Sequence, residues 1–202
     1  MSLKLYLNPA SPYVRRVRVT AQELGFSGKI ELINATLNPV SPHDGVRSCN
    51  PIGKIPALVL DDGAALYDSR VICEYLDALA GGTRVFPAAG AARWTALRRQ
   101  AIGDGIMDAA VLTRYEDTVR PNEIRWQNWV DGQFLKIRTA LDALEHENLD
   151  GAFDIGTIAI ACALEYLDFR FASEGWRTNR PRLAAWAAVI SKRPSLVATA
   201  PA

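Results

Sequence analysis

A serine at the start of a predicted helix is the first residue whose type and position could do chemistry. Residues 3–7 have the apolar density of a buried strand, and apolar residues recur at helical spacing after Pro12. Ser11 is therefore predicted to cap that helix, with Pro12 at the first helical position. A helix start presents free N–H groups and a positive dipole end, which favour anions and thiolates. Ser11 is thus either a cap alone or a cap that also serves a bound thiolate.

A second candidate stretch runs from Asn50 to Leu58, with the sequence Asn-Pro-Ile-Gly-Lys-Ile-Pro-Ala-Leu. Pro56 stands just before an apolar run, so it is either a plain turn residue or a cis-proline beside a strand. A cis-proline would leave the backbone N–H and C=O of Ile55 free to pair with an extended ligand.

Asp68 and Ser69 follow a predicted hairpin and open the next predicted helix. Ser69 and the helix N–H groups can hold a carboxylate, while Asp68 can accept a hydrogen bond from an ammonium group. This combination fits the headgroup of an amino acid. The alternative is an ordinary pair of N-cap residues.

The elements that must position these residues are predicted from the period of the apolar residues. A strand, a helix and a second strand at the start of the chain predict a parallel pair with a right-handed crossover. Residues 36–50 are predicted to be a loop with at most a short irregular helix. An Asp-Gly turn between apolar runs predicts a hairpin. The predicted order is strand 3–7, helix 12–25, strand 29–35, strands 57–60 and 64–67, and helix 68–80.

No strand-like segment follows these elements. Residues 81–90 contain three glycines and Pro87, which is typical of a linker. We therefore predict an α+β/α protein with an α+β domain over residues 1–80, a linker over 81–90 and an all-α helical bundle over 91–202. The predicted helices are 91–118, 122–147 opened by Pro121, the buried central helix 154–172, and 182–192, followed by a loose tail over 194–202.

Composition and charge exclude several classes of partner. The 202 residues include 23 basic and 22 acidic ones, so the net charge of +1 gives no footprint for nucleic acid or a membrane surface. No secretory signal pattern is visible, and no apolar stretch reaches the roughly 20 residues that span a bilayer. Cys49, Cys73 and Cys162 form no metal pattern with the two histidines. We expect reduced thiols, no metal and a cytoplasmic location.

In combination, these motifs resemble the soluble glutathione transferase family over essentially the whole chain. The resemblance rests on Ser11-Pro12-Tyr13 after a first strand, on residues 50–58, and on Asp68-Ser69 before a helix. Residues 154–157 stand where the family has its Ser/Thr-x-x-Asp capping box, with the residue types exchanged. Asp154 remains a good N-cap. The resemblance implies a thioredoxin-like first domain that binds glutathione, a helical second domain that supplies the acceptor pocket, and a homodimer.

The resemblance also implies roles for single residues. Ser11 takes the place of the residue that activates the glutathione sulfur. Tyr6 is the alternative, because some branches of the family use a tyrosine on the first strand. A serine before a proline and an aromatic residue is typical of the serine and cysteine branches. The implied glutathione contacts are Lys54 for the glycine carboxylate, Ile55 and cis-Pro56 for the cysteinyl backbone, and Asp68 and Ser69 for the γ-glutamyl end.

Candidates for the acceptor pocket are less specific. Side chains on the expected inner faces of helices are more often core or interface residues than ligand contacts. These candidates are Tyr13, Met107, Ala110, Val111, Arg114 and Tyr115.

The expected function is that of a serine-type, bacterial-like glutathione transferase in detoxification, which joins the glutathione thiolate to a small, hydrophobic electrophile. Lowering the thiol pKa from about 8.5 to about 6.5 raises the thiolate fraction roughly 25-fold, but weaker nucleophilicity removes roughly 8-fold. Most of the acceleration must therefore come from holding the acceptor beside the sulfur. The alternatives are a glutathione-dependent peroxidase, isomerase or disulfide reductase, or a non-catalytic glutathione-binding regulatory protein.

Overall fold

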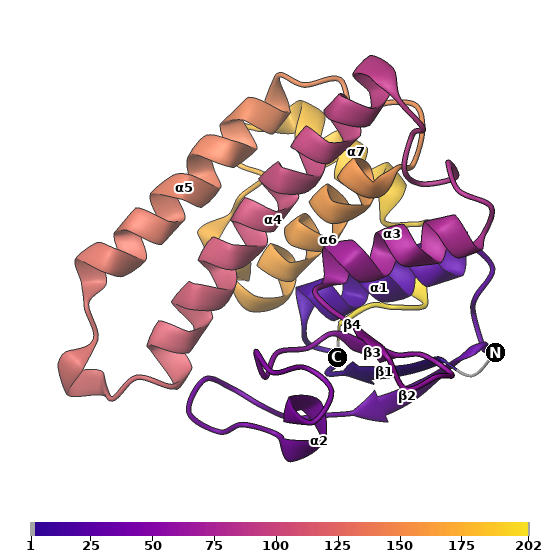
Figure 1. Ribbon diagram of the computed structural model, residues 1–202. Helices are drawn as coiled ribbons and strands as arrows, with labels where there is room; N and C mark the ends of the chain where they lie inside the picture. Colours follow the sequence, from indigo (N-terminus) through magenta and orange to yellow (C-terminus); the bar gives the residue numbers. More distant parts are fainter. Residues whose placement is uncertain (1–2, 202) are drawn as a thin grey trace. The chain divides into compact units, whose positions relative to one another are not determined.

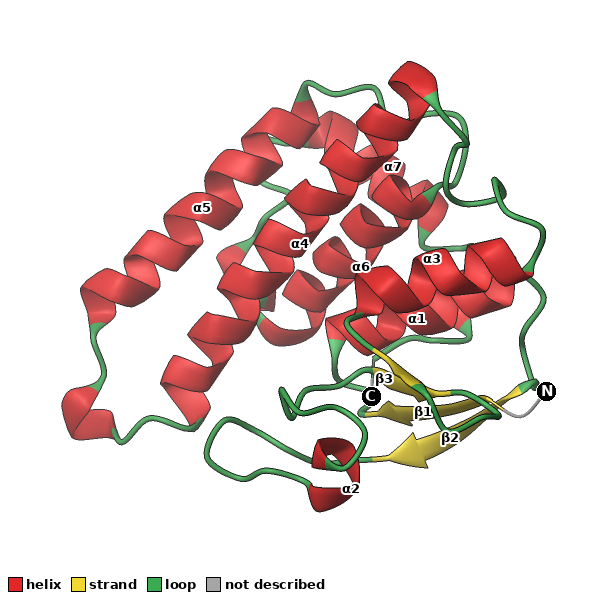
Figure 2. Ribbon diagram, in the orientation of Figure 1, coloured by secondary structure: helices red, strands yellow, loops and turns green. Residues whose placement is uncertain are grey.

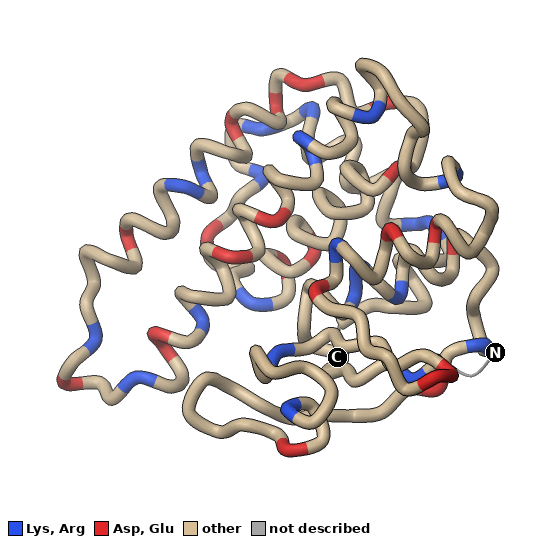
Figure 3. The backbone as a smooth tube through the Cα atoms, in the orientation of Figure 1, with Lys and Arg blue, Asp and Glu red and all other residues tan. Residues whose placement is uncertain are grey.

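A computed structural model describes residues 3–201 of the chain (Figure 1). These residues form two compact units: residues 3–93 with residues 194–201, and residues 94–193. The domain boundaries predicted from the sequence stay a prediction, and residues 1, 2 and 202 lie outside the described part. No helix within residues 3–201 is long and apolar enough to cross a membrane. Basic and acidic residues are interspersed along the tube in each unit (Figure 3).

The first unit contains a four-stranded mixed sheet in the order β2-β1-β3-β4. β1 pairs in parallel with β2 and antiparallel with β3, and β3 pairs antiparallel with β4. This topology confirms the predicted β-α-β-β-β-α order, with strands shorter than predicted in the hairpin. The strands are β1 (Leu3–Leu7), β2 (Ile30–Asn34), β3 (Ala57–Val59) and β4 (Ala65–Leu66).

Two helices of the first unit cover one face of this sheet. α1 (Pro12–Glu23) and α3 (Ser69–Leu79) lie side by side (Figure 1). Val14 and Val17 of α1 are completely buried, as the helical spacing predicts. A four-residue helix, α2 (Asp44–Arg47), interrupts the loop that precedes β3.

The end of the chain corrects the prediction of a loose tail. Residues 194–197 form a short helix, α8 (Pro194–Val197), which packs against α1. Leu196 is only 1% exposed, and its carbonyl oxygen accepts a hydrogen bond from Arg15 Nη2 at 3.1 Å. The hydroxyl of Ser195 donates to Glu23 Oε1 at 2.5 Å. A four-residue helix is too short to show a hydrophobic period, so the sequence pattern carried no signal for it.

The second unit consists of helices and loops (Figure 2). α6 is buried through residues 155–164, which confirms that it is the central helix. Asp154 caps α6, because its Oδ1 accepts from the N–H groups of Gly156 and Thr157 at 2.9 and 3.0 Å. A Cβ atom at Gly156 would lie 2.5 Å from the carbonyl oxygen of Ala96, so α4 and α6 approach closely there. The helices are α4 (Gly90–Thr118), α5 (Gln127–Glu145), α6 (Ile155–Arg170) and α7 (Pro181–Ile190).

The start of α5 differs from the prediction that Pro121 opens a helix over residues 122–147. Pro121 instead precedes a short 3₁₀ helix, η1 (Asn122–Ile124), and a second, η2 (Ala172–Glu174), follows α6. The N–H of Trp126, the N-cap of α5, donates to Glu116 Oε1 at 3.0 Å. Ile124 continues the apolar period of α5 in the sequence, yet it is 58% exposed, so periodicity alone placed the helix start too early.

We predict that Leu196→Ala destabilises the first unit because it opens a cavity between α8 and α1. The free energy of unfolding should fall by about 2–5 kcal/mol, as for other buried leucines. Val197→Ala is the matched control, since Val197 is 61% exposed in the same helix. Urea denaturation followed by circular dichroism measures both variants. Equal losses for the two would show that Leu196 does not anchor the segment.

Candidate active site

Three segments that carry predicted site residues meet at one edge of the sheet. Tyr6 of β1 lies opposite Ala57 of the antiparallel β3, so the end of β1 is beside the start of β3. Leu58 lies opposite Leu66 in the antiparallel pair of β3 and β4, so the end of β4 reaches the same edge. The register therefore gathers residues 8–11 after β1, residues 53–56 before β3 and residues 67–69 after β4.

Ser11 caps α1 as predicted. Its Oγ accepts a hydrogen bond from Val14 N at a long 3.4 Å, and its N–H donates to Asn8 O at 2.9 Å. The side chain is half-buried. No acceptor for the Ser11 hydroxyl proton is found among residues 3–201, so the hydroxyl can donate to an anion placed before α1.

Tyr6, the alternative activator, lies on β1 and is half-buried. Its ring meets the ring of His43 edge-on, with 6.4 Å between the centroids. His43 in turn caps α2, because its Nδ1 accepts from Val46 N at 3.3 Å. This packing gives Tyr6 a contact between β1 and the α2 loop, and its role in activating a thiol stays a prediction.

Residues 53–56, before β3, have the features expected of a loop whose backbone pairs with a ligand. The Ile55–Pro56 peptide bond is cis, which was one of the two alternatives drawn from the sequence. Pro56 is buried, Ile55 is half-buried and Lys54 is exposed. The ammonium group of Lys54 is therefore accessible to a carboxylate, and the backbone of Ile55 lies next to it.

Asp68 caps α3 at the same edge. Its Oδ1 accepts from Arg70 N at 2.9 Å, and its Oδ2 forms an ion pair with Arg70 Nη2 at 3.2 Å. Burial alone raises the pKa of the Asp68 carboxyl, but the hydrogen bonds from Arg70 and the charges of Arg70 and Arg16 outweigh it and lower the pKa. Asp68 is exposed and ionised at neutral pH, so it can accept from an ammonium group.

Ser69 faces the interior and is tied to a residue that the sequence analysis missed. Ser69 is 1% exposed, and its Oγ accepts a hydrogen bond from Nη2 of Arg16, which is also 1% exposed. This bond links α1, which Ser11 caps, to the start of α3. The available signal was an arginine pair, Arg15 and Arg16, set between two valines of an otherwise apolar helix face.

The acceptor candidates divide between the two units. Tyr13 lies on α1 and is half-buried, whereas the others lie on α4. Met107 is completely buried in the core of the second unit, and Ala110 is equally buried. Three half-buried side chains share one face of α4 at helical spacing, and burial raises the pKa of the Tyr115 phenol. These three are Val111, Arg114 and Tyr115.

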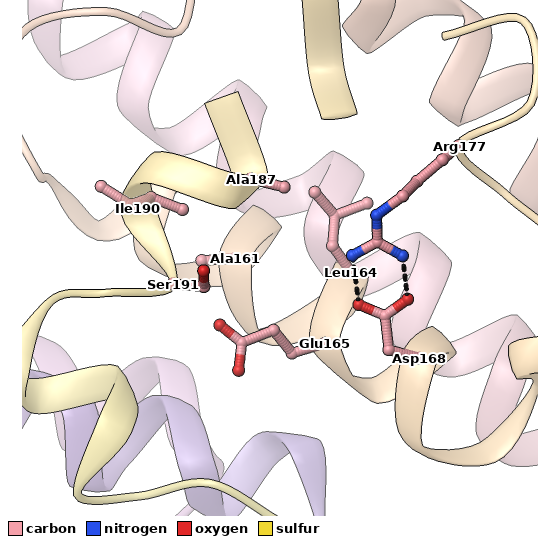
Figure 4. Close-up of a pocket in the computed structure, with 8 residues that line it drawn as sticks. All are labelled: Ala161, Leu164, Glu165, Asp168, Arg177, Ala187, Ile190 and Ser191. Atoms are coloured by element: carbon pink, nitrogen blue, oxygen red, sulfur yellow. Dashed lines mark hydrogen bonds and ion pairs between the residues drawn. The ribbon is translucent and has the colours of Figure 1, made fainter. Parts of the chain in front are cut away.

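A small cavity lies elsewhere in the second unit, between α6 and α7 (Figure 4). Its volume of about 30 Å³ gives room for roughly one water molecule. Asp168 and Arg177 close one side through an ion pair, with Arg177 Nη2 donating to Asp168 Oδ2 at 2.7 Å. None of the site residues predicted from the sequence lines this cavity, and it is too small for a peptide ligand. Residues 3–201 also contain no cluster of three or more His, Cys, Asp or Glu that could hold a metal ion.

Comparison with protein families gives two matches. The model described as "Glutathione S-transferase, N-terminal domain" matches residues 10–79, and the one described as "Glutathione S-transferase, C-terminal domain" matches residues 127–188. The chain belongs to the glutathione S-transferase family. Among its relatives, the GST-like protein YibF of Escherichia coli (strain K12) is 33% identical over 204 residues, which covers 98% of this chain and 98% of YibF.

Two solved structures of a glutathione transferase family member from Pseudomonas fluorescens Pf-5 are similar to this chain. One, with bound glutathione, has a TM-score of 0.97 and 51% identity, and the match covers 99% of each chain. The other, with bound S-(propanoic acid)-glutathione, has a TM-score of 0.92 and 50% identity, covering 99% of this chain and 100% of that one. Glutathione is thus a ligand of structurally similar members of the glutathione S-transferase family.

We predict that Ser69→Ala lowers the free energy of unfolding by about 1–3 kcal/mol, because it removes the buried hydrogen bond that Arg16 Nη2 donates to Ser69 Oγ. Ser48→Ala is the control: Ser48 is exposed, and its Oγ donates to Gly45 O at 2.9 Å. Its effect should stay within about 0.5 kcal/mol. Urea denaturation at neutral pH compares the two. A loss for Ser69→Ala no larger than that for Ser48→Ala would contradict a structural role for the bond.

Proposed function

We propose that this protein is a serine-type glutathione transferase that joins the glutathione sulfur to a small electrophilic acceptor. The observation that carries the proposal is the meeting, at one sheet edge, of the Ser11 hydroxyl, the backbone before cis-Pro56 and the Asp68 carboxylate. A hydroxyl, a free backbone and a carboxylate can bind, in turn, the thiolate, the cysteinyl backbone and the γ-glutamyl ammonium group of glutathione. Family membership and the glutathione bound by the Pseudomonas fluorescens relative support the same ligand.

Each part of glutathione has a partner of matching chemistry in the first unit. The thiolate lies before the start of α1, where Ser11 donates to it. The cysteinyl backbone pairs with Ile55, and Lys54 binds the glycine carboxylate. The ionised Asp68 accepts from the γ-glutamyl ammonium group. The γ-glutamyl carboxylate lies at the start of α3, at Ser69 and near the buried charge of Arg16.

Ser11 acts as a hydrogen-bond donor rather than as a base. A serine hydroxyl needs an adjacent base before it can remove a proton. Within residues 3–201, Ser11 accepts hydrogen bonds from Val14 N and Arg15 N and donates one to Asn8 O, and none of these groups is a base. The donated hydrogen bond and the positive end of α1 favour the ionised thiol. The thiolate then forms a bond to the electrophilic carbon, and the leaving group departs with its electron pair.

Transfer is favoured over disulfide exchange by the residue at position 11. Exchange through a mixed disulfide with the protein requires a cysteine beside the ligand, and position 11 provides a serine instead. The S-(propanoic acid)-glutathione bound by the second Pseudomonas fluorescens structure supports a site that tolerates a carbon substituent on sulfur. For acceptor recognition in the second unit we propose the half-buried Val111, Arg114 and Tyr115 of α4, and not Met107, which is buried in the core.

We further propose that the protein is a cytoplasmic homodimer that acts in detoxification. Cys49, Cys73 and Cys162 form no disulfide bond within residues 3–201, which suits a reducing compartment. Each unit also exposes a large apolar side chain that a partner subunit could cover: Val71 on α3 is 46% exposed and Trp94 on α4 is 68% exposed.

Ser11→Ala tests the proposed chemistry. Calorimetry should show wild-type binding of glutathione with Kd of about 1 mM or tighter, the level expected of a co-substrate. Ser11→Ala should bind glutathione nearly as well but conjugate 1-chloro-2,4-dinitrobenzene at least about tenfold more slowly, since its thiolate loses a charge-assisted hydrogen bond. We vary 1-chloro-2,4-dinitrobenzene at saturating glutathione, so the inflection in the pH dependence of kcat/KM reports the pKa of the bound thiol. This inflection should move to higher pH in Ser11→Ala.

Tyr6→Phe is the matched comparison and should keep its rate within about twofold. Full activity of Ser11→Ala together with slow conjugation by Tyr6→Phe would assign activation of the glutathione sulfur to Tyr6. Absence of glutathione binding to the wild type would reject the transferase function, and binding without turnover would favour a regulatory protein.

A further inference from the structure

Asn50 is a polar residue held almost completely away from solvent at the edge that carries the candidate site. It is 2% exposed, and both ends of its side-chain amide are bonded to the loop that follows it. Its Nδ2 donates to Lys54 O at 2.8 Å, and its Oδ1 accepts from Ile52 N at 3.0 Å. A buried amide with both ends satisfied fixes the groups that it contacts.

The backbone of Asn50 adds two more bonds to the same turn. Its N–H donates to Val46 O at 2.7 Å, which anchors it to α2, and its carbonyl accepts from Gly53 N at 2.8 Å. Gly53 has a φ of +68°, a conformation that other residues rarely adopt. The order Asn, Pro, any residue, Gly is typical of a tight turn with the asparagine at its first position. The turn therefore has one geometry, and Asn50 holds it from inside.

The bond from Asn50 to Lys54 O also sets the direction of the next N–H group. Lys54 O and Ile55 N belong to the same planar peptide unit. The cis bonds within residues 3–201 are Ile55–Pro56 and Tyr67–Asp68, so the Lys54–Ile55 bond is trans. In a trans peptide the C=O and N–H groups point in opposite directions. Because Asn50 holds Lys54 O on the inside of the loop, the N–H of Ile55 points away from it.

The N–H of Ile55 has no acceptor within residues 3–201, whereas the N–H groups of Ile52 and Gly53 in the same loop both donate to Asn50. Ile55 is half-buried and stands directly before cis-Pro56 and β3. A backbone N–H that is held in one direction without an acceptor is prepared to bind a carbonyl oxygen of an extended ligand. The donor at the site is therefore the N–H of Ile55, and the bond from Asn50 to Lys54 O fixes its direction.

We propose that Asn50 is a positioning residue, which aims the N–H of Ile55 at the cysteinyl carbonyl of bound glutathione. The inference rests on the proposed function, because the ligand is the one assigned there. Asn50 touches no reacting atom and acts through the peptide between Lys54 and Ile55. By fixing this peptide before the ligand arrives, Asn50 removes the ordering cost from glutathione binding.

Two substitutions of Asn50 test the proposal. Asn50→Asp keeps the acceptor for Ile52 N but loses the donor to Lys54 O, and Asn50→Ala loses both without adding a charge. Calorimetry with glutathione and with S-methylglutathione should show Kd raised about three- to tenfold in both variants, which corresponds to one hydrogen bond. KM for glutathione should rise by the same factor, with KM for 1-chloro-2,4-dinitrobenzene unchanged.

Asn38→Asp is the matched control. Asn38 lies in the same unit, and its Oδ1 also accepts from the N–H two residues ahead, Val40 N, at 3.0 Å. The Asn38→Asp variant adds the same negative charge as Asn50→Asp and should bind glutathione with the wild-type Kd. A purely structural role for Asn50 would lower the melting temperature and the calorimetric stoichiometry but leave Kd unchanged in the folded fraction. That result, or a wild-type Kd in both Asn50 variants, would overturn the proposal and leave the transferase function intact.

Amide exchange of the wild-type protein gives a test that needs no variant to fold. By nuclear magnetic resonance, the Ile55 amide should exchange quickly in the free protein and at least about tenfold more slowly with saturating glutathione, as expected for a newly bonded N–H. An Ile55 amide already protected in the free protein, or unchanged by bound glutathione, would contradict the proposal. Absence of glutathione binding would reject the proposed function and this inference together.

Discussion

The antiparallel register between β1 and β3 is the constraint on which the site depends. Only three residues of β3 pair with β1, yet this ladder brings the end of one strand to the start of the other. A register shift of one residue would turn every side chain of β3 to the opposite face and move Pro56 along the edge. Ala57 and Leu58 are both completely buried and point to opposite faces, so such a shift would exchange a small and a large side chain in packed surroundings. The position of Ile55 beside the start of α1 follows from the packing of this short strand.

Buried guanidinium groups stabilise the elements that the sheet positions. Arg15 and Arg16 are 2% and 1% exposed, and removing a hydrogen-bond acceptor from a buried charge is costly. Arg15 bonds to the carbonyl of Leu196, and Arg16 bonds to the hydroxyl of Ser69. Both bonds are specific in direction, unlike the apolar contacts of the same helix. α1 is therefore fixed in rotation as well as in position, and so is the serine that caps it.

The sequence predicted best what is local and repeated. The cap at Ser11, the cap at Asp154, the order of strands and the buried α6 follow from patterns that span one element, and the structure confirms them. The resemblance drawn from the motifs likewise led to the correct family. The predicted start of α5 was wrong because the apolar period in the sequence includes Ile124, whereas the helix begins only at Gln127. The roles of Asn50, Arg16 and Leu196 depend on contacts between segments far apart or on the direction of single bonds, and neither leaves a period in the sequence.

The packing of α8 has a consequence for the order in which the protein folds. Residues 194–201 belong to the same compact unit as residues 3–93, although the ribosome makes the whole second unit between them. Leu196 therefore becomes available to α1 and to the Arg15 guanidinium only after the one hundred residues 94–193 have been synthesised. Domains generally fold as units and from the N-terminus during synthesis. In this chain, α8 can dock and complete the first unit only after the second unit has been synthesised.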